Sequence, residues 1–161
     1  MRKTLLPNIE TVKAGDGLTL RIKFRGRGTK TARLDGFIAR EKLLAPLRDK
    51  RLFDRVKAID WGGGVGWPNG LDLSADTLWR MAEEQAPFTA DDFVRWQRDT
   101  VLSNAETAEA LGVSLATIKN YRSGAEIPAA VAIACRAMAA EPATLAAHFR
   151  PRKAAGRPKA A

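Results

Sequence analysis

The stretch LSNAETAEALGVSLATIKNYRSG, residues 102–124, decides the fold of the second half of the chain. Ser103 and Ser114 are favourable helix N-caps, because a serine hydroxyl can accept a hydrogen bond from a free amide of the first helical turn. Gly112 can adopt the left-handed conformation that ends a helix and turns the chain. The stretch therefore predicts two short helices, 104–111 and 115–123, joined by a tight turn.

The same stretch has small and apolar residues at the spacing that holds two helices together. Ala108 lies where the two helices come so close together that only a small side chain fits between them. The positions expected to face inward are Leu111, Val113, Ile118 and Tyr121. The second helix then has on its outer side Leu115, Ala116, Lys119 and Asn120.

The sequence around this stretch is also helical in character. After Pro87 strand signals are missing, and alanine, a strong helix former, is frequent. Further helices are expected at 89–101, 128–140 and 142–149. The short connections between them are typical of a compact all-helical bundle.

Residues 89–149 resemble the helix-turn-helix domain of the lambda-repressor-like (Cro and phage-repressor) family. Ala108, Gly112 and Val113 match the alanine, glycine and β-branched residue of the family signature, and YRSGAEIP at 121–128 is similar to the family's ending. In such proteins the second helix lies in the major groove of DNA, and its first turn meets base edges.

This resemblance implies an interface and a function. The residues that would face bases are Ser114, Leu115, Ala116 and Asn120; those that would reach phosphates are Asn104 and Thr117; and those that would add charge are Lys119 and Arg122. The chain would be a bacterial DNA-binding transcriptional regulator, acting as a homodimer on two half-sites about one helical turn apart. Its first domain would bind a protein partner or support dimerisation.

An alternative interpretation stays open. Leu115 and Ala116 stand where many family members have glutamine or arginine, and Thr107 is polar where an apolar residue is usual. Residues 87–149 hold five Lys/Arg and seven Asp/Glu, a net charge of −2 that does not attract a polyanion. The alternative is a protein-interaction module, such as the antitoxin half of a toxin–antitoxin pair.

The first half of the chain alternates short apolar runs with glycine-rich turns. Strands are expected at 9–14, 18–24, 29–34 and 55–60, and helices at 40–47 and 74–84. The glycine run 62–66 is expected to be a hairpin turn. Together these elements predict an α+β domain over residues 1–86, with a small antiparallel sheet and one or two helices, followed by the all-α domain at 87–149.

Cations alternate with apolar residues over 18–27, so that a strand there would have one basic face and one core face. The basic face is either an ordinary solvated surface or a surface for nucleic acid or an acidic protein.

Residues 51–82, RLFDRVKAIDWGGGVGWPNGLDLSADTLWRMA, resemble the bacterial domain-of-unknown-function family 2442. A Phe-rich turn, a strand, a Trp-Pro-Asn-Gly turn and Asp-Leu-Ser before a short helix occur in the family's order, and the match extends over about residues 9–82. The resemblance implies a small α+β unit that occurs alone or joined to a helix-turn-helix. Trp61, Trp67 and Trp79 are expected to be packing residues, because they flank turns and a capped helix.

The last residues, 150–161, hold five cations and no acidic residue, and we expect a basic disordered tail. Gly156-Arg157-Pro158 is similar to the core of an AT-hook, in which arginine enters a narrow A·T minor groove. Arg157 is therefore a candidate DNA contact, and a solvated tail that aids solubility is the alternative. Of the chain's net charge of +9, residues 1–86 supply +6 and the tail +5.

The sequence offers little for catalysis or for a cofactor. His148 is the single histidine, and the single cysteine, Cys135, has no base near it in sequence. No Gly-Lys-Ser/Thr follows the glycine run 62–66, so a phosphate-binding loop is not indicated. The first residues have too short an apolar run for a signal peptide, and no stretch approaches the ~20 apolar residues of a membrane span. We expect a cytoplasmic, soluble protein that is not an enzyme and has no membrane partner.

Overall fold

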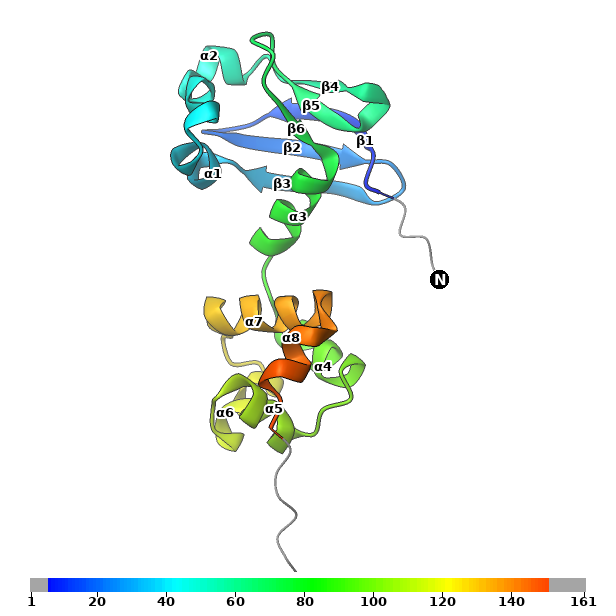
Figure 1. The fold of residues 1–161 in the computed structure, drawn as a ribbon, viewed down its shortest axis with the longest axis vertical. Coiled ribbons are helices and arrows are strands. Elements are labelled where there is room, and N and C mark those ends of the chain that lie inside the picture. Colours follow the sequence, from blue (N-terminus) through cyan, green and yellow to red (C-terminus); the bar gives the residue numbers. More distant parts are fainter. Residues whose placement is uncertain (1–5, 151–161) are drawn as a thin grey trace, which may run out of the picture. The chain divides into compact units, whose positions relative to one another are not determined.

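The computed structural model describes residues 6–150, and the chain divides into two compact units (Figure 1). Unit 1 ends at Ala86 and unit 2 begins at Pro87. Unit 1 contains small antiparallel sheets and unit 2 is helical, which confirms the predicted order of structure along the chain. The predictions for the tail, including Arg157, lie outside the described residues.

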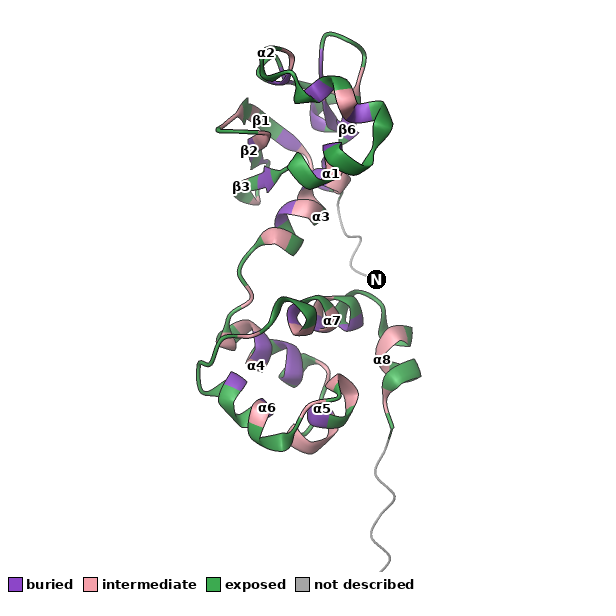
Figure 2. Cartoon of the chain, turned by 90° about the vertical axis from the view of Figure 1, so that its left-hand side faces the viewer, coloured by how far each residue is buried: buried purple, intermediate pink, exposed green. Residues whose placement is uncertain are grey.

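The first sheet of unit 1 is antiparallel and has its strands in chain order. It consists of β1 (Ile9–Ala14), β2 (Thr19–Phe24) and β3 (Gly28–Arg33). The strands of this sheet hold both buried and exposed residues (Figure 2). Along β2, Leu20, Ile22 and Phe24 are buried, whereas Arg21 and Lys23 are exposed. One face of this sheet therefore belongs to the core of unit 1 and the other face is open to solvent.

A second antiparallel sheet of three short strands was only partly predicted. It consists of β4 (Lys57–Ile59), β5 (Gly64–Gly66) and β6 (Asp72–Ser74). The prediction of a hairpin turn at 62–66 was wrong, because the last three of these residues form the central strand. A Cβ atom on Gly64 would lie 2.6 Å from the carbonyl oxygen of Leu73, so the close pairing of β5 and β6 requires glycine there.

Helical segments connect the two sheets and close unit 1. They are α1 (Asp35–Arg40), the 3-10 helix η1 (Lys42–Arg48), α2 (Lys50–Phe53) and α3 (Ala75–Gln85). The predicted helix at 40–47 was wrong, because α1 ends at Arg40 and a separate 3-10 helix with Pro46 inside it follows. Proline has no N–H to donate and does not fit the interior of an α-helix. The start of α3 agrees with the sequence, because the Ser74 hydroxyl accepts a hydrogen bond from the Thr77 amide at 3.1 Å.

Two of the three tryptophans of unit 1 pack as expected. The Trp67 ring is buried, and its Nε1 donates a hydrogen bond to the Phe53 carbonyl oxygen at 3.0 Å. The Trp79 ring lies edge-on to the Phe24 ring, with ring centres 4.9 Å apart. These contacts tie α2 to the second sheet and α3 to the first.

Trp61 is not a packing residue, contrary to the prediction. It lies in the short 3-10 segment η2 (Asp60–Gly62), and its side chain is 97% exposed. Asp60 and Trp61 both have left-handed backbone conformations, with φ of 50° and 51°. The Asn8 side-chain amide donates to the Trp61 carbonyl oxygen at 2.9 Å. The chain is therefore fixed here while the indole ring stays in solvent.

Between residues 87 and 150, unit 2 contains five helices. They are α4 (Ala90–Asp99), α5 (Asn104–Leu111), α6 (Leu115–Arg122), α7 (Ala129–Ala140) and α8 (Pro142–His148). The helix α4 ends before the predicted boundary, because Val101 has a left-handed backbone with φ of 57°.

In α7 the Cys135 side chain is buried, and burial raises the pKa of its thiol from 9.0 to about 12.

Gly62→Ala tests the fixed turn at Trp61. Gly62 has φ of 93°, and a Cβ atom there would lie 2.3 Å from the Ile9 carbonyl oxygen. We expect unit 1 to lose more than about 2 kcal/mol of unfolding free energy, measured by urea denaturation. Gly70→Ala is the matched control, because Gly70 has φ of 84° but open space around it. Its cost should stay near the ~1 kcal/mol of a left-handed alanine. Equal losses in the two variants would contradict the role of the Ile9 contact.

Asp92→Asn tests the capping box of α4. The Thr89 amide and hydroxyl donate to the Asp92 carboxylate at 2.9 and 2.8 Å, and these bonds lower the pKa of Asp92 below 3.8. A lowered pKa stabilises the fold above the unfolded-state pKa, and the stabilisation is lost as pH falls through the folded-state pKa. We expect the variant to be about 1 kcal/mol less stable than wild type at pH 7, and the difference to vanish in acid. The control Asp91→Asn removes a carboxylate from the same helical turn without breaking the capping box, so its loss of stability at pH 7 should be smaller.

Candidate nucleic-acid interface

The helices α5 and α6 are joined by a turn whose geometry follows from three residues. The Ser103 hydroxyl accepts from the Glu106 amide at 3.2 Å, and the Ser114 hydroxyl accepts from the Thr117 amide at 3.1 Å. Gly112 has φ of 66°, the left-handed conformation expected from the sequence. The Val113 amide then donates back to the Ala108 carbonyl oxygen at 2.9 Å, which closes the end of α5.

The inner sides of α5 and α6 pack on α4. Ala108, Ile118 and Tyr121 are buried, and the Tyr121 ring lies edge-on to Phe93 of α4, with ring centres 5.6 Å apart. Leu111 and Val113 are half-buried against the same core. The residues predicted to face inward therefore do so, and one side of α6 is fixed to the rest of unit 2.

A buried polar network joins α4, α5 and α6, and the sequence analysis missed its centre. Gln97 of α4 is 3% exposed. Its side-chain nitrogen donates to Thr107 Oγ1 and to Asn104 Oδ1, at 2.9 Å each, and its oxygen accepts from Arg122 Nη1. The Thr107 hydroxyl donates onward to the Ser103 carbonyl oxygen at 2.8 Å.

This network explains the polar residue at position 107, which the sequence analysis counted in favour of protein association. Thr107 is fully buried, and its hydroxyl is both donor and acceptor within unit 2. The periodicity of α4 could have revealed Gln97, because it follows the buried Phe93 by four residues and therefore lies on the same inward side of the helix.

The residues expected to face DNA fall into two groups in the structure. Four of them lie exposed together on α6: Leu115, Ala116, Lys119 and Asn120. The other described residues engage in contacts within unit 2. The hydroxyls of Ser114 and Thr117 bond to each other at 2.8 Å in the cap of α6, and Arg122 and Asn104 belong to the Gln97 network.

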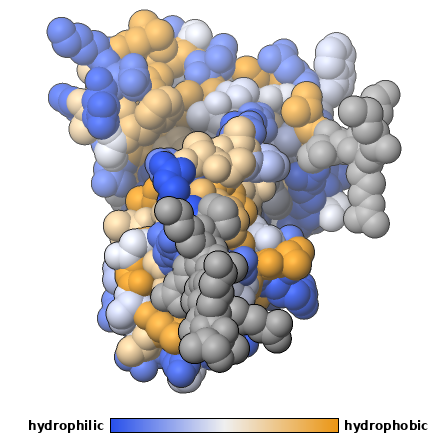
Figure 3. Space-filling model, turned by 60° about the horizontal axis from the view of Figure 1, so that its bottom comes forward, coloured by the Kyte–Doolittle hydropathy of each residue, from blue (hydrophilic) through white to orange (hydrophobic). Residues whose placement is uncertain are grey.

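The exposed side of α6 is mixed in character. Leu115 is 44% exposed, and the exposed Lys119 follows it by four residues on the same helix. The end of unit 2 that comes forward in Figure 3 shows hydrophilic and hydrophobic side chains interspersed, outside the grey atoms. A surface of this kind can offer both a charge and an apolar contact to a partner.

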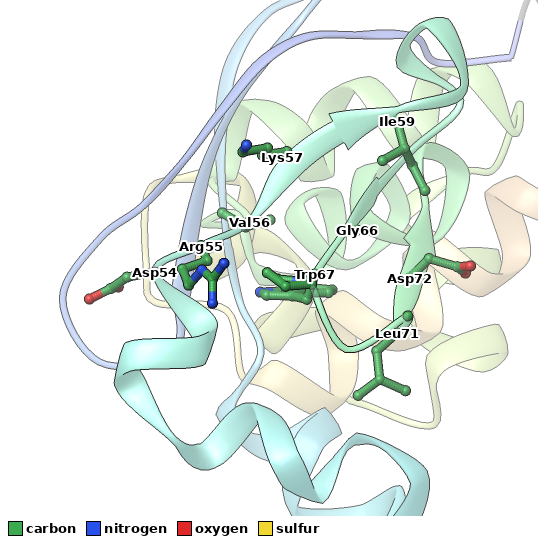
Figure 4. Close-up of a pocket in the computed structure, with 11 residues that line it drawn as sticks. Asp54, Arg55, Val56, Lys57, Ile59, Gly66, Trp67, Leu71 and Asp72 are labelled. Atoms are coloured by element: carbon green, nitrogen blue, oxygen red, sulfur yellow. The ribbon is translucent and has the colours of Figure 1, made fainter.

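A hollow of about 560 Å³ lies on unit 1 (Figure 4). Arg55 and Lys57 line it together with Asp54 and Asp72, and Trp67 lies among them. The two cations and two carboxylates balance, so that charge selects no class of ligand. Within residues 6–150, no cluster of three or more His, Cys, Asp or Glu side chains could hold a metal ion.

No single helix within the described part of the chain is long and apolar enough to cross a membrane. The pair α7 and α8 reaches the required length and composition only when counted together, and the two helices are bent by 116° at the break between them.

Comparison with known proteins bears on both units. Residues 9–84 match the family DUF2442, described as a protein of unknown function. No curated protein matches the chain. The chain is similar to the crystal structure of a "Putative DNA Binding Protein" from Nitrosomonas europaea, with 25% sequence identity and a TM-score of 0.50. That similarity covers 95% of this chain and 98% of the other, so it includes both units.

Gln97→Met tests the buried network. The substitution keeps the side-chain length but leaves the Thr107 hydroxyl and the Arg122 guanidinium without their amide partner. We expect a loss of about 2–3 kcal/mol in the unfolding free energy of unit 2, measured by urea denaturation followed by helical circular dichroism. The double variant Gln97→Met/Thr107→Val should recover part of this loss, because an apolar pair leaves fewer unpaired groups. Wild-type stability in the single variant would show that the network contributes nothing.

Proposed function

We propose that α5 and α6 form a helix-turn-helix of the lambda-repressor-like type and that the protein is a bacterial DNA-binding transcriptional regulator. The observation that carries the proposal is the division of α6 into two sides. Ile118 and Tyr121 fix its inner side to the core, while Leu115, Lys119 and Asn120 stay exposed. A helix that is held rigidly and has a free side is what major-groove recognition requires.

The dimensions of α6 suit the groove. A helix with its side chains is about 10–12 Å in diameter, and the major groove is about 12 Å wide. Asn120 offers the amide that pairs with both N6 and N7 of adenine, and Leu115 and Ala116 offer apolar contact to a thymine methyl group. Lys119 supplies a charge for a phosphate. With one bidentate side chain, sequence discrimination would be modest.

The remaining candidate residues take positioning roles in this proposal. Ser114 and Thr117 hold the first turn of α6 through their mutual hydrogen bond. Arg122 anchors the last turn of α6 to Gln97. Asn104 accepts from Gln97 through its oxygen, which leaves its amide nitrogen available to a phosphate at the start of α5. Direct contact would then fall to Leu115, Ala116, Lys119 and Asn120 of α6 and to the amide of Asn104.

The similarity to the Nitrosomonas protein supports a role in DNA binding, because it extends over nearly the whole of both chains. By analogy with repressors that read two half-sites, the active form would be a homodimer in the cytoplasm. The proposal assigns the protein a binding role without catalysis or a cofactor.

A protein-interaction role, such as that of an antitoxin, is the second candidate, and Trp61 favours it. Trp61 is exposed on a held turn, and tryptophan is enriched among the residues that contribute most binding energy in protein interfaces. Such an interaction would use unit 1 and is compatible with DNA binding through unit 2. It becomes the leading candidate if the chain fails to bind duplex DNA.

The test of DNA binding uses the full chain and fluorescently labelled duplexes, one from the promoter region of its own gene and one of random sequence. We expect a shift at ~50 mM salt, where counterion release favours binding most. Lys119→Ala and Asn120→Ala should each weaken binding by about tenfold, the equivalent of ~1.4 kcal/mol. Lys42→Ala is the control for lost charge, because Lys42 is exposed at the start of η1 in unit 1.

The outcomes separate the two candidates. Loss of affinity in the α6 variants but not in the Lys42 control supports the helix-turn-helix. Wild-type affinity in both α6 variants would move the interface elsewhere. No binding of any duplex at ~50 mM salt would end the regulator proposal.

A further inference from the structure

The open face of the first sheet carries a regular array of cations and hydroxyls. Strand pairing places Lys13 opposite Arg21, Thr11 opposite Lys23 and Thr19 opposite Arg33. Because alternate strand residues share a face, these side chains lie together on the solvent side of the sheet. We call this set the cation–threonine face; its members are Thr11, Lys13, Thr19, Arg21, Lys23, Thr29, Thr31 and Arg33.

The charge of this face is largely uncompensated. Lys23 pairs with Glu10, with Nζ 2.7 Å from the carboxylate oxygen. The side chains of Lys13, Arg21 and Arg33 have no carboxylate within ion-pair distance anywhere in residues 6–150. The face thus holds four cations, against which the structure places the carboxylate of Glu10 in β1. It therefore presents a net positive surface across three strands.

The pairing of Lys13 with Arg21 costs stability. Like charges directly opposite each other on neighbouring strands repel, and a bound anion removes that repulsion. The threonines add hydroxyl donors between the cations, at the ~4.8 Å spacing of neighbouring strands. Cations alternating with hydroxyls are the side chains that most often contact phosphate oxygens.

The absence of apolar members decides between two classes of partner. Protein interfaces have an apolar core surrounded by a polar rim, and this face offers no apolar side chain for such a core. Interfaces with nucleic acid are more polar and much more positively charged. The face is therefore more complementary to the phosphate backbone of a nucleic acid than to the surface of an acidic protein.

We propose that the cation–threonine face binds the sugar–phosphate backbone of duplex DNA, as a second contact in addition to the one that α6 makes. This inference rests on the proposed function and names the part of unit 1 that serves it. The contact would also supply electrostatic attraction that the helical unit lacks. Residues 87–149 have a net charge of −2 and therefore do not attract DNA over long distances by themselves. The contact is independent of sequence, since a flat sheet face presents phosphate ligands and no element that enters a groove.

The test replaces three of the face's cations in the full chain, as Lys13→Gln/Arg21→Gln/Arg33→Gln. The matched control, Arg40→Gln/Lys42→Gln/Arg55→Gln, removes the same charge from exposed positions outside the face. Binding of a random-sequence duplex is followed by fluorescence anisotropy between ~50 and ~300 mM salt. We expect the slope of log affinity against log salt to fall by about 2.7 in the face variant, at ~0.9 per lost phosphate contact, and by less than about 1 in the control.

Folding provides a second readout. Because the face variant removes like-charge repulsion, its thermal midpoint at low salt should equal or exceed that of wild type. A weakly binding but stable face variant supports a functional contact. Equal slopes in the face variant and the control would overturn the proposal.

The remaining outcomes separate this inference from the proposed function. If the α6 variants lose affinity while the face variant binds as wild type, only the present inference fails. If wild type binds no duplex, both fail. If the face variant keeps its DNA affinity but loses binding to labelled poly-glutamate that wild type shows, the partner of the face is an acidic protein and the DNA inference is wrong.

Discussion

The side chain of Gln97 is the constraint on which the helical unit depends. Its side-chain nitrogen donates hydrogen bonds to Asn104 and Thr107 of α5, and its oxygen accepts one from Arg122 of α6. The amide thereby joins α4 to both of these helices. A buried amide of this kind tolerates only arrangements that satisfy all of its hydrogen bonds, so it fixes the rotation of α6 as well as its distance from α4. The exposed side of α6 is therefore defined by this polar contact together with the packing of Ile118 and Tyr121.

Local signals in the sequence were enough to predict much of unit 2. Serine caps, a left-handed glycine and small inward residues act within a few positions of one another, so the bounds of α5 could be read directly. The exposure of Leu115 and Asn120 also followed from helical periodicity. The network could not be predicted in full, because the contact of Gln97 with Arg122 joins residues 25 positions apart. Polarity at position 107 alone is compatible with several roles.

Unit 1 was harder to predict, because its short elements are stabilised by tertiary pairing more than by local preference. Glycine at 64 and 66 is a weak strand former, and only the approach of β6 makes a strand of this segment. The exposure of Trp61 depends in the same way on a distant residue, since Asn8 holds its carbonyl group. Composition favours burial of tryptophan, but the backbone conformation of this turn directs the ring outward.

The burial of Cys135 gives the helical unit a built-in probe. The sequence contains one cysteine, and its thiol stays protonated and enclosed at neutral pH. Alkylating reagents attack thiolates, so modification of this protein must wait until α7 separates from its neighbours. The rate of labelling consequently reports the opening of unit 2 without interference from unit 1. A ligand that binds α6 stabilises the folded state of unit 2, so it would slow the modification of Cys135 without contacting that residue.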